Sequence, residues 1–190
     1  TGDQAHAEER LKELVSEAVF TQLGVTDRIN KADKLTKMLQ VVAFNIGEPL
    51  SYNEIAEKCG LDNETVERYI DLLEKAFILV RLPSFYNGHR YELKKTHIIF
   101  FNDNGIRNGI IRNFNPLTMR MDEDLLWKNW LISERIKWNR INGKKCDYYF
   151  WRSHTRQQMD FIEIQDNSKH LHPRQLGLAF CSIASIISPL

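Results

Sequence analysis

The feature that most constrains the fold of this chain is a helix–turn–helix pattern over residues 51–76. Ser51 and Glu54 have the spacing of a capping box, in which each side chain accepts a hydrogen bond from a backbone amide at the start of a helix. Gly60 ends that helix, and a second, longer helix is predicted over about residues 62–76. A short helix, a tight glycine turn and a longer helix together indicate a helix–turn–helix.

The segments on either side of this pattern complete a winged helix. Apolar residues at three-and-four spacing predict helices over about residues 7–24 and 34–46. Short apolar runs predict strands over residues 78–80 and 97–101. Two strands after a helix–turn–helix form a wing, so we expect residues 30–102 to fold as a winged helix.

The second half of the chain predicts a further module of helices and strands. A short helix over residues 106–110 precedes a long helix over residues 123–142, with Asp122 as its cap. Two β-like runs follow, over residues 147–152 and 159–165, with a polar segment between them that suits a hairpin loop. Taken with the winged helix, this module predicts an α+β fold.

The composition is that of an ordinary globular protein, because 43% of the 190 residues are hydrophobic and 27% are charged. The three cysteines are far apart and form no Cys-x-x-Cys pair, which argues against a disulfide framework and fits a reducing, cytoplasmic compartment. The sequence begins without methionine or a leader, so we interpret it as a fragment of a longer protein. The apolar stretch over residues 176–190 is shorter than the roughly 20 residues of a membrane span, so no membrane partner is expected.

The charge is distributed unevenly along the chain. Residues 1–76 hold 9 Lys/Arg and 15 Asp/Glu, a balance of −6, whereas residues 77–190 hold 17 and 10, a balance of +7. An acidic half and a basic half indicate two modules with different tasks, and the basic half is the better candidate for a contact with nucleic acid.

Several runs of residues resemble, in order and over about residues 8–167, a large family of bacterial and archaeal ATP-binding proteins. The runs are Ile46-Gly47, Leu50 to Ala56, Thr65 to Phe77, Arg81-Leu82, Asp103 to Asn108, Asn115-Pro116-Leu117 and Tyr149 to Arg152. This resemblance implies an N-terminal AAA-type ATPase domain, followed by a winged helix and a PD-(D/E)XK nuclease-like module. No Gly-x-x-x-x-Gly-Lys-Ser/Thr motif, which binds the phosphates of ATP, occurs here. We therefore expect no cofactor in this chain and ATP only in the absent ATPase domain. That ATPase domain is the expected partner of this chain.

The resemblance also identifies candidate metal ligands. Glu134 matches the helix acid and Asp160 the strand acid of the nuclease signature, which binds Mg²⁺ to activate water and steady the scissile phosphate. The Glu-x-Lys expected about a dozen residues later is absent, since residues 170–174 read His-Leu-His-Pro-Arg. Glu163 is a weak substitute because alternation along the strand predicts that it faces away from Asp160. The sequence therefore predicts an incomplete nuclease site in which Glu134 and Asp160 are catalytically inactive.

The candidate contacts with nucleic acid lie on the winged helix. Arg68 is placed near the front of the recognition helix, but residues 62–75 hold five acids against two basic residues, and this balance repels phosphate. The wing is better suited to DNA because four of its basic residues cluster: Arg81, Arg90, Lys94 and Lys95. Contacts of the winged helix with its own ATPase domain or another protein are favoured over contacts with DNA.

We therefore divide the chain into four regions. Residues 1–29 are a helical linker, residues 30–102 a winged helix, residues 103–167 a partial nuclease-like module, and residues 168–190 a tail that departs from the family. The tail suggests a truncated or frameshifted gene, or residues that are not native. The leading interpretation is an accessory region of an AAA-type ATPase that contacts DNA or protein through its winged helix. The alternatives are a Mg²⁺-dependent DNA endonuclease module and a protein-interaction or homo-oligomerisation domain.

Overall fold

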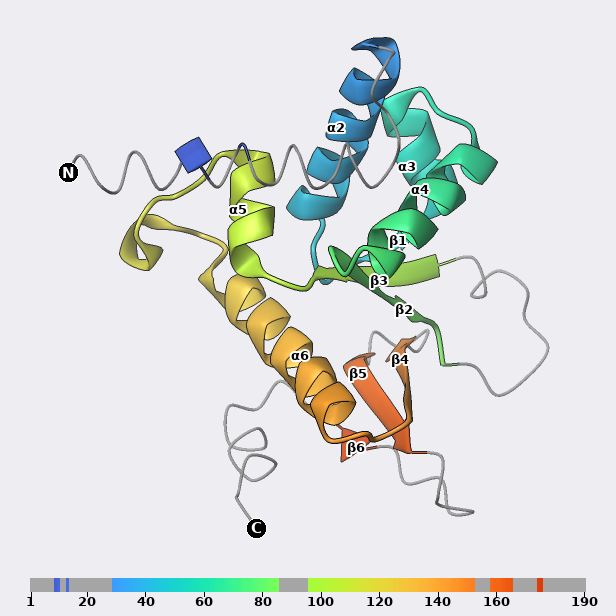
Figure 1. The fold of residues 1–190 in the computed structure, drawn as a ribbon, viewed down its shortest axis with the longest axis vertical. Coiled ribbons are helices and arrows are strands. Elements are labelled where there is room, and N and C mark those ends of the chain that lie inside the picture. Colours follow the sequence, from blue (N-terminus) through green and yellow to red (C-terminus); the bar gives the residue numbers. More distant parts are fainter. Residues whose placement is uncertain are drawn as a thin grey trace.

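The computed structural model describes residues 9–10, 13, 29–85, 96–152, 158–165 and 174–175 of the chain. These residues form an α+β fold, as the sequence predicts, and their strands form two antiparallel sheets of three strands each (Figure 1). Most of the helix predicted over residues 7–24, most of the wing loop and most of the tail lie outside the described residues.

The first part of the fold is a helix–turn–helix closed by a small sheet. Its elements are α2 (Ile29–Phe44), β1 (Pro49–Ser51), α3 (Tyr52–Cys59), α4 (Asn63–Lys75), β2 (Leu79–Pro83) and β3 (Thr96–Phe101). The strands are ordered β1-β3-β2 and both pairings are antiparallel. Strand β1 was not predicted because three residues are too few to show a strand pattern in the sequence. It lies directly before the capping box and pairs with β3.

The start and end of α3 follow the local signals in the sequence. The Ser51 hydroxyl accepts a hydrogen bond from the Glu54 amide at 3.2 Å, and the Glu54 carboxylate accepts one from the Ser51 amide at 2.7 Å. Gly60 takes the left-handed conformation, with φ of 64°, and its amide donates to the Ala56 carbonyl. Both predictions, the capping box and the glycine stop, are confirmed.

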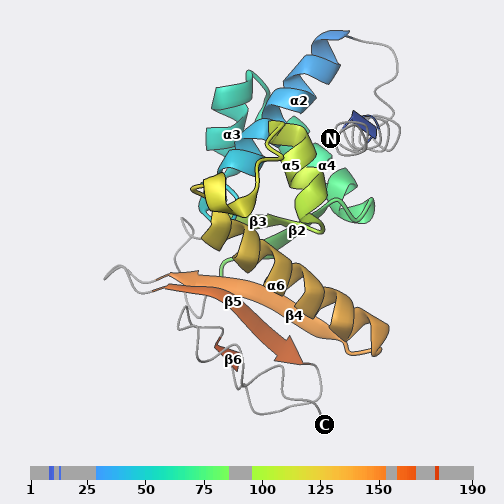
Figure 2. The ribbon, with the colours of Figure 1, turned by 90° about the vertical axis from the view of Figure 1, so that its left-hand side faces the viewer.

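The second part places a long helix across a second sheet. Its elements are α5 (Asn104–Ile111), the 3-10 turn η2 (Leu117–Met119), α6 (Glu123–Ile141), β4 (Cys146–Arg152), β5 (Gln158–Gln165) and β6 (Arg174–Gln175). The strands are ordered β4-β5-β6, and α6 runs over the sheet (Figure 2). Asp122 precedes α6 as predicted, but its carboxylate makes no capping hydrogen bond to the helix.

The two parts share one hydrophobic core. Buried side chains from α2, β3, α6 and β4 belong to the same cluster, among them Met38, Phe100, Ile132 and Phe150. The two residues after β2 also reach the second sheet: Ser84 forms an isolated bridge with Phe150, and the Phe85 amide donates to the Phe150 carbonyl at 2.5 Å. Among the residues that the structure describes, no helix has the length and apolar character needed to cross a membrane.

Candidate functional site

The face of α4 that a helix–turn–helix would present to a partner is acidic. Glu64 and Glu67 are exposed on α4, and Arg68 beside them is also exposed, with its guanidinium carbon 5.6 Å from the centre of the Tyr69 ring. Asp62, the exposed cap of the helix, adds another negative charge. The surface around Arg68 therefore carries more negative than positive charge.

Arg81, which the sequence predicts as a contact to DNA, is used within the fold. Its guanidinium forms ion pairs with Asp71 at 2.8 Å and Glu74 at 2.7 Å, and it donates a hydrogen bond to the Tyr52 hydroxyl. Only 22% of the side chain is exposed. Arg81 therefore links β2 to α3 and α4, and its charge is compensated by two carboxylates.

The structure does not describe the other three predicted nucleic-acid contacts. Arg90, Lys94 and Lys95 lie outside the described residues. Of the five candidates, Arg68 is the one that the described part of the chain places at the surface without an ion pair.

The structure places Asp160 in an ion pair under α6. Asp160 is 5% exposed, and its carboxylate lies 3.0 Å from the Lys128 ammonium and accepts a hydrogen bond from the Gln158 amide at 3.1 Å. Glu134 forms an ion pair with Lys137 at 2.7 Å, and 47% of its side chain is exposed. At 3.6 residues a turn, Glu134 lies about 120° around α6 from Lys128, so the fold separates the two predicted metal ligands.

Glu163 also faces α6, and the prediction that it faces away from Asp160 is wrong. Its carboxylate accepts two hydrogen bonds from Arg135, at 2.7 and 2.9 Å. The register of β4 and β5 shifts between Tyr149 and Trp151, which leaves two residues of β5 opposite one of β4. This bulge interrupts the alternation at Asp160, so both acids reach cations of the same helix.

These contacts do not fit a Mg²⁺ site. The carboxylates of Asp160 and Glu163 form ion pairs with Lys128 and Arg135. The Glu134 carboxylate instead pairs with Lys137 of its own helix. Within the described ranges, no group of three or more His, Cys, Asp or Glu side chains is placed to hold a metal ion. The signal that sequence reasoning missed is the spacing of the two cations, seven residues apart on one side of α6.

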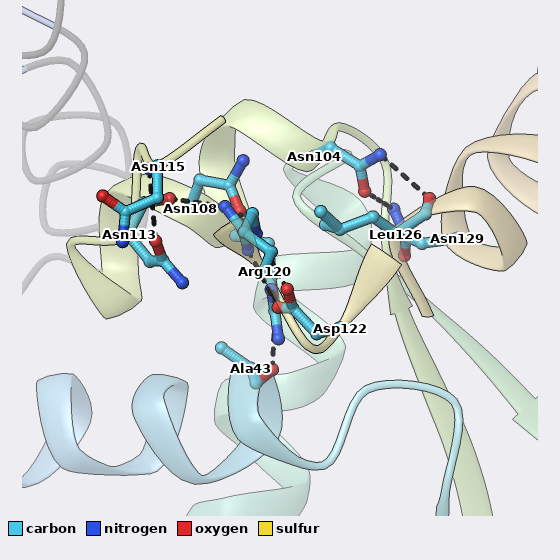
Figure 3. A network of polar contacts seen from close by, with 10 residues as sticks. Ala43, Asn104, Asn108, Asn113, Asn115, Arg120, Asp122, Leu126 and Asn129 are labelled. Carbon is cyan, nitrogen blue, oxygen red and sulfur yellow. Dashed lines mark hydrogen bonds and ion pairs between the residues drawn. The ribbon is translucent and has the colours of Figure 1, made fainter. Parts of the chain in front are cut away.

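The Asp103 to Asn108 motif belongs to a buried polar junction (Figure 3). The Arg107 side chain donates to the Ala43 carbonyl of α2 at 3.0 Å and pairs with Asp122. Arg120 holds the same Asp122 carboxylate with two hydrogen bonds of 2.8 Å. These bonds, from Arg120 first and then Arg107, keep the pKa of Asp122 well below its ordinary value. The carboxylate thus joins the loop before α6 to α5 and α2.

The fold is an α+β fold that contains a helix–turn–helix. The contacts described above show that several of the sequence motifs connect helices and strands within the fold. The chain belongs to a family described as a domain of unknown function (DUF8612), which matches residues 2–117. The matched residues include the helix–turn–helix, its sheet and α5, and they end before α6.

The chain is also similar to an uncharacterized protein of Haemophilus influenzae. The two are 31% identical over 115 residues, which cover 55% of this chain and 29% of that protein. The chain therefore spans less than a third of the length of the relative it matches. No solved structure matches this chain.

Proposed function

We propose that this chain is an accessory region of an AAA-type ATPase and that its helix–turn–helix binds a protein surface, with the ATPase domain of the same protein as the first candidate. The acidic face of α4 is the observation that carries this proposal. The ATPase assignment rests on the resemblance of the sequence motifs. It is supported by the greater length of the Haemophilus influenzae relative, of which the alignment covers 29%.

The charge of the helix–turn–helix favours a protein partner over DNA. Neutralisation of phosphates by Lys and Arg supplies most of the sequence-independent affinity for DNA. Here Glu64 and Glu67 are exposed beside Arg68, and Arg81 is paired with two carboxylates. A basic patch on a protein complements this face, whereas a DNA backbone is repelled by it.

The experiment measures binding of the chain to its own ATPase domain and, separately, to a labelled DNA duplex. We expect the ATPase domain to bind, and we expect the helix–turn–helix to contribute no affinity for the duplex at physiological salt. The double substitution Glu64→Lys/Glu67→Lys should weaken binding to the ATPase domain by about tenfold or more, because it reverses the charge at the contact.

A matched control carries the same change in net charge away from α4. Glu48 and Glu123 are exposed, and Glu48→Lys/Glu123→Lys should leave binding to the ATPase domain within about twofold of the original. Salt-sensitive binding of the duplex that is lost on Arg68→Glu would place DNA on α4 and contradict the proposal, as would equal losses in both double variants.

A further inference from the structure

A cleft lies where the end of α6 meets the start of β4. Its volume is about 570 Å³. Pockets of roughly 300–1,000 Å³ are the size that binds small molecules in proteins. The residues that line it are Ile136, Arg140, Gly143, Lys144, Lys145, Cys146, Asp147 and Tyr148.

Three cations at this cleft have no carboxylate partner in the part of the chain that the structure describes. Among the described residues, Arg140, Lys144 and Lys145 form no ion pair, in contrast to Lys128 and Arg135, which lie earlier in α6. Arg140 and Lys145 are exposed to solvent. The positive charge of this group is therefore available to a ligand.

Aromatic rings hold two of these cations in place. The Lys144 ammonium lies 4.4 Å from the centre of the Trp138 ring, and the Arg140 guanidinium carbon lies 4.7 Å from the centre of the Phe77 ring. A ring face attracts a cation without carrying a formal charge. These contacts therefore restrict the side chains and leave their charges uncompensated.

The remaining groups at the cleft do not cancel this charge. Asp147 is the one acid among the lining residues, so the lining carries three positive charges against one negative. Burial raises the pKa of the Cys146 thiol and of the Tyr148 hydroxyl, so both groups are neutral near pH 7. The Glu163 carboxylate, near Cys146, is paired with Arg135.

Stabilisation of the helix end does not account for all three cations. A basic residue in the last turn of a helix complements its dipole, and Arg140 occupies such a position. Lys144 and Lys145 come after Ile141, the last residue of α6, and the dipole effect falls off within the last turn.

We propose that this cleft binds a phosphoryl group, carried either by a nucleotide or by a nucleic-acid strand. Arg140, Lys144 and Lys145 contact the phosphate oxygens, and Trp138 is a positioning residue for Lys144. Lysine ammoniums with a guanidinium fork suit a group that has several oxygens and more than one negative charge. The site is separate from the acidic face of α4. Phosphate binding at the cleft and the protein contact proposed for α4 can therefore be tested independently.

The test measures binding of the full chain to a fluorescent oligothymidylate of about 20 nucleotides, with ATP, inorganic phosphate and a polyglutamate peptide as competitors. The substitution Lys144→Glu/Lys145→Glu should weaken binding by about tenfold or more. Lys37→Glu/Lys58→Glu changes the net charge equally at two exposed residues of α2 and α3, and it should alter affinity by less than about twofold. Melting temperatures of both variants establish that each is folded.

The competitors distinguish the two sources of phosphate. If ATP displaces the oligonucleotide at an equal concentration of phosphate groups, the ligand of the cleft is a nucleotide. If ATP does not displace it, the ligand is a nucleic-acid strand. The proposal is overturned if polyglutamate competes as well as ATP or the oligonucleotide does. It is also overturned if the unmodified chain does not bind, or if the control variant loses as much affinity as Lys144→Glu/Lys145→Glu.

The role of Trp138 has its own readout. Trp138→Leu should weaken binding by about threefold, and Trp138→Phe should restore most of that loss because it retains a ring face for Lys144. Equal affinities of the Leu and Phe variants would remove Trp138 from the site.

Discussion

At the residue scale, the structure separates charges that compensate one another from charges that are free. Arg81, Arg107 and Arg135 appear in the sequence simply as basic residues, yet each is bound to a carboxylate inside the fold. Arg140 and Lys144 are instead held by aromatic rings. The net charge of a segment is therefore a poor guide to which of its side chains can bind a ligand.

His97 is a residue whose environment predicts a dependence of stability on pH. Its ring stacks on Tyr52, with centres 4.8 Å apart and planes 11° apart. Burial, together with the positive charge of Arg81, lowers the pKa of His97 from 6.5 to about 4. The unfolded chain therefore takes up this proton at a higher pH than the folded chain does.

The stability contribution of neutral His97 is complete above pH 6.5 and is lost as pH falls from 6.5 toward 4. Between pH 7 and pH 4.5, we expect the free energy of unfolding to fall by about 1–2 kcal/mol more for the original chain than for His97→Phe, after allowance for solvent screening. Phenylalanine retains the stack on Tyr52 and does not titrate. Urea unfolding at several pH values measures this difference, and parallel curves for the two proteins would refute it.

At the element scale, the side chain of Asn129 adds a polar link between α6 and the first sheet. Asn129 is fully buried, and its amide accepts from the Phe101 amide at 2.7 Å and donates to the Phe101 carbonyl at 2.9 Å. It also donates to the Asn104 side chain at 2.8 Å. The asparagine thus pairs with the end of β3 as a neighbouring strand would, and joins it to α5 and α6.

Removal of this amide should be costly because it leaves buried backbone groups without partners. We expect Asn129→Ala to lower the free energy of unfolding by about 2–4 kcal/mol. Asn142 is exposed, and within the described residues its side chain bonds to the Trp138 carbonyl alone, so Asn142→Ala should change the free energy of unfolding by less than about 0.5 kcal/mol. Chemical denaturation of the two variants provides the comparison, and similar losses would show that burial at Asn129 does not matter.

At the scale of the whole molecule, the two parts predicted from the sequence are joined by a continuous core. Ile132 and Ile136 of α6 and Phe161 of β5 belong to the same buried cluster as Phe100 and Phe101 of β3. The polar junction around Asp122 adds a second connection, because Arg107 reaches from α5 to the end of α2. Neither part can therefore unfold without exposing apolar surface of the other.

We expect the chain to unfold in one cooperative transition. All four tryptophans lie at or after residue 127, so their fluorescence reports on the second part, whereas circular dichroism at the helical band reports on both. The two signals should have the same midpoint, and Phe150→Ala, which removes a buried ring of β4, should lower both midpoints together by the equivalent of about 3–5 kcal/mol. Two separated midpoints would indicate independent domains.

The sequence by itself determined the elements whose signals are local. The capping box at Ser51, the glycine stop at Gly60 and the periodicity of α4 each depend on residues within one or two turns, so they were predicted correctly. Contacts between distant segments were decided only by the tertiary structure. The bulge in β5 placed Asp160 and Glu163 under the same helix, and Arg107 reaches a carbonyl 64 residues earlier in the chain. No local pattern encodes these contacts, because they depend on how the helices and sheets pack, and that packing determines which charges remain free to bind a partner.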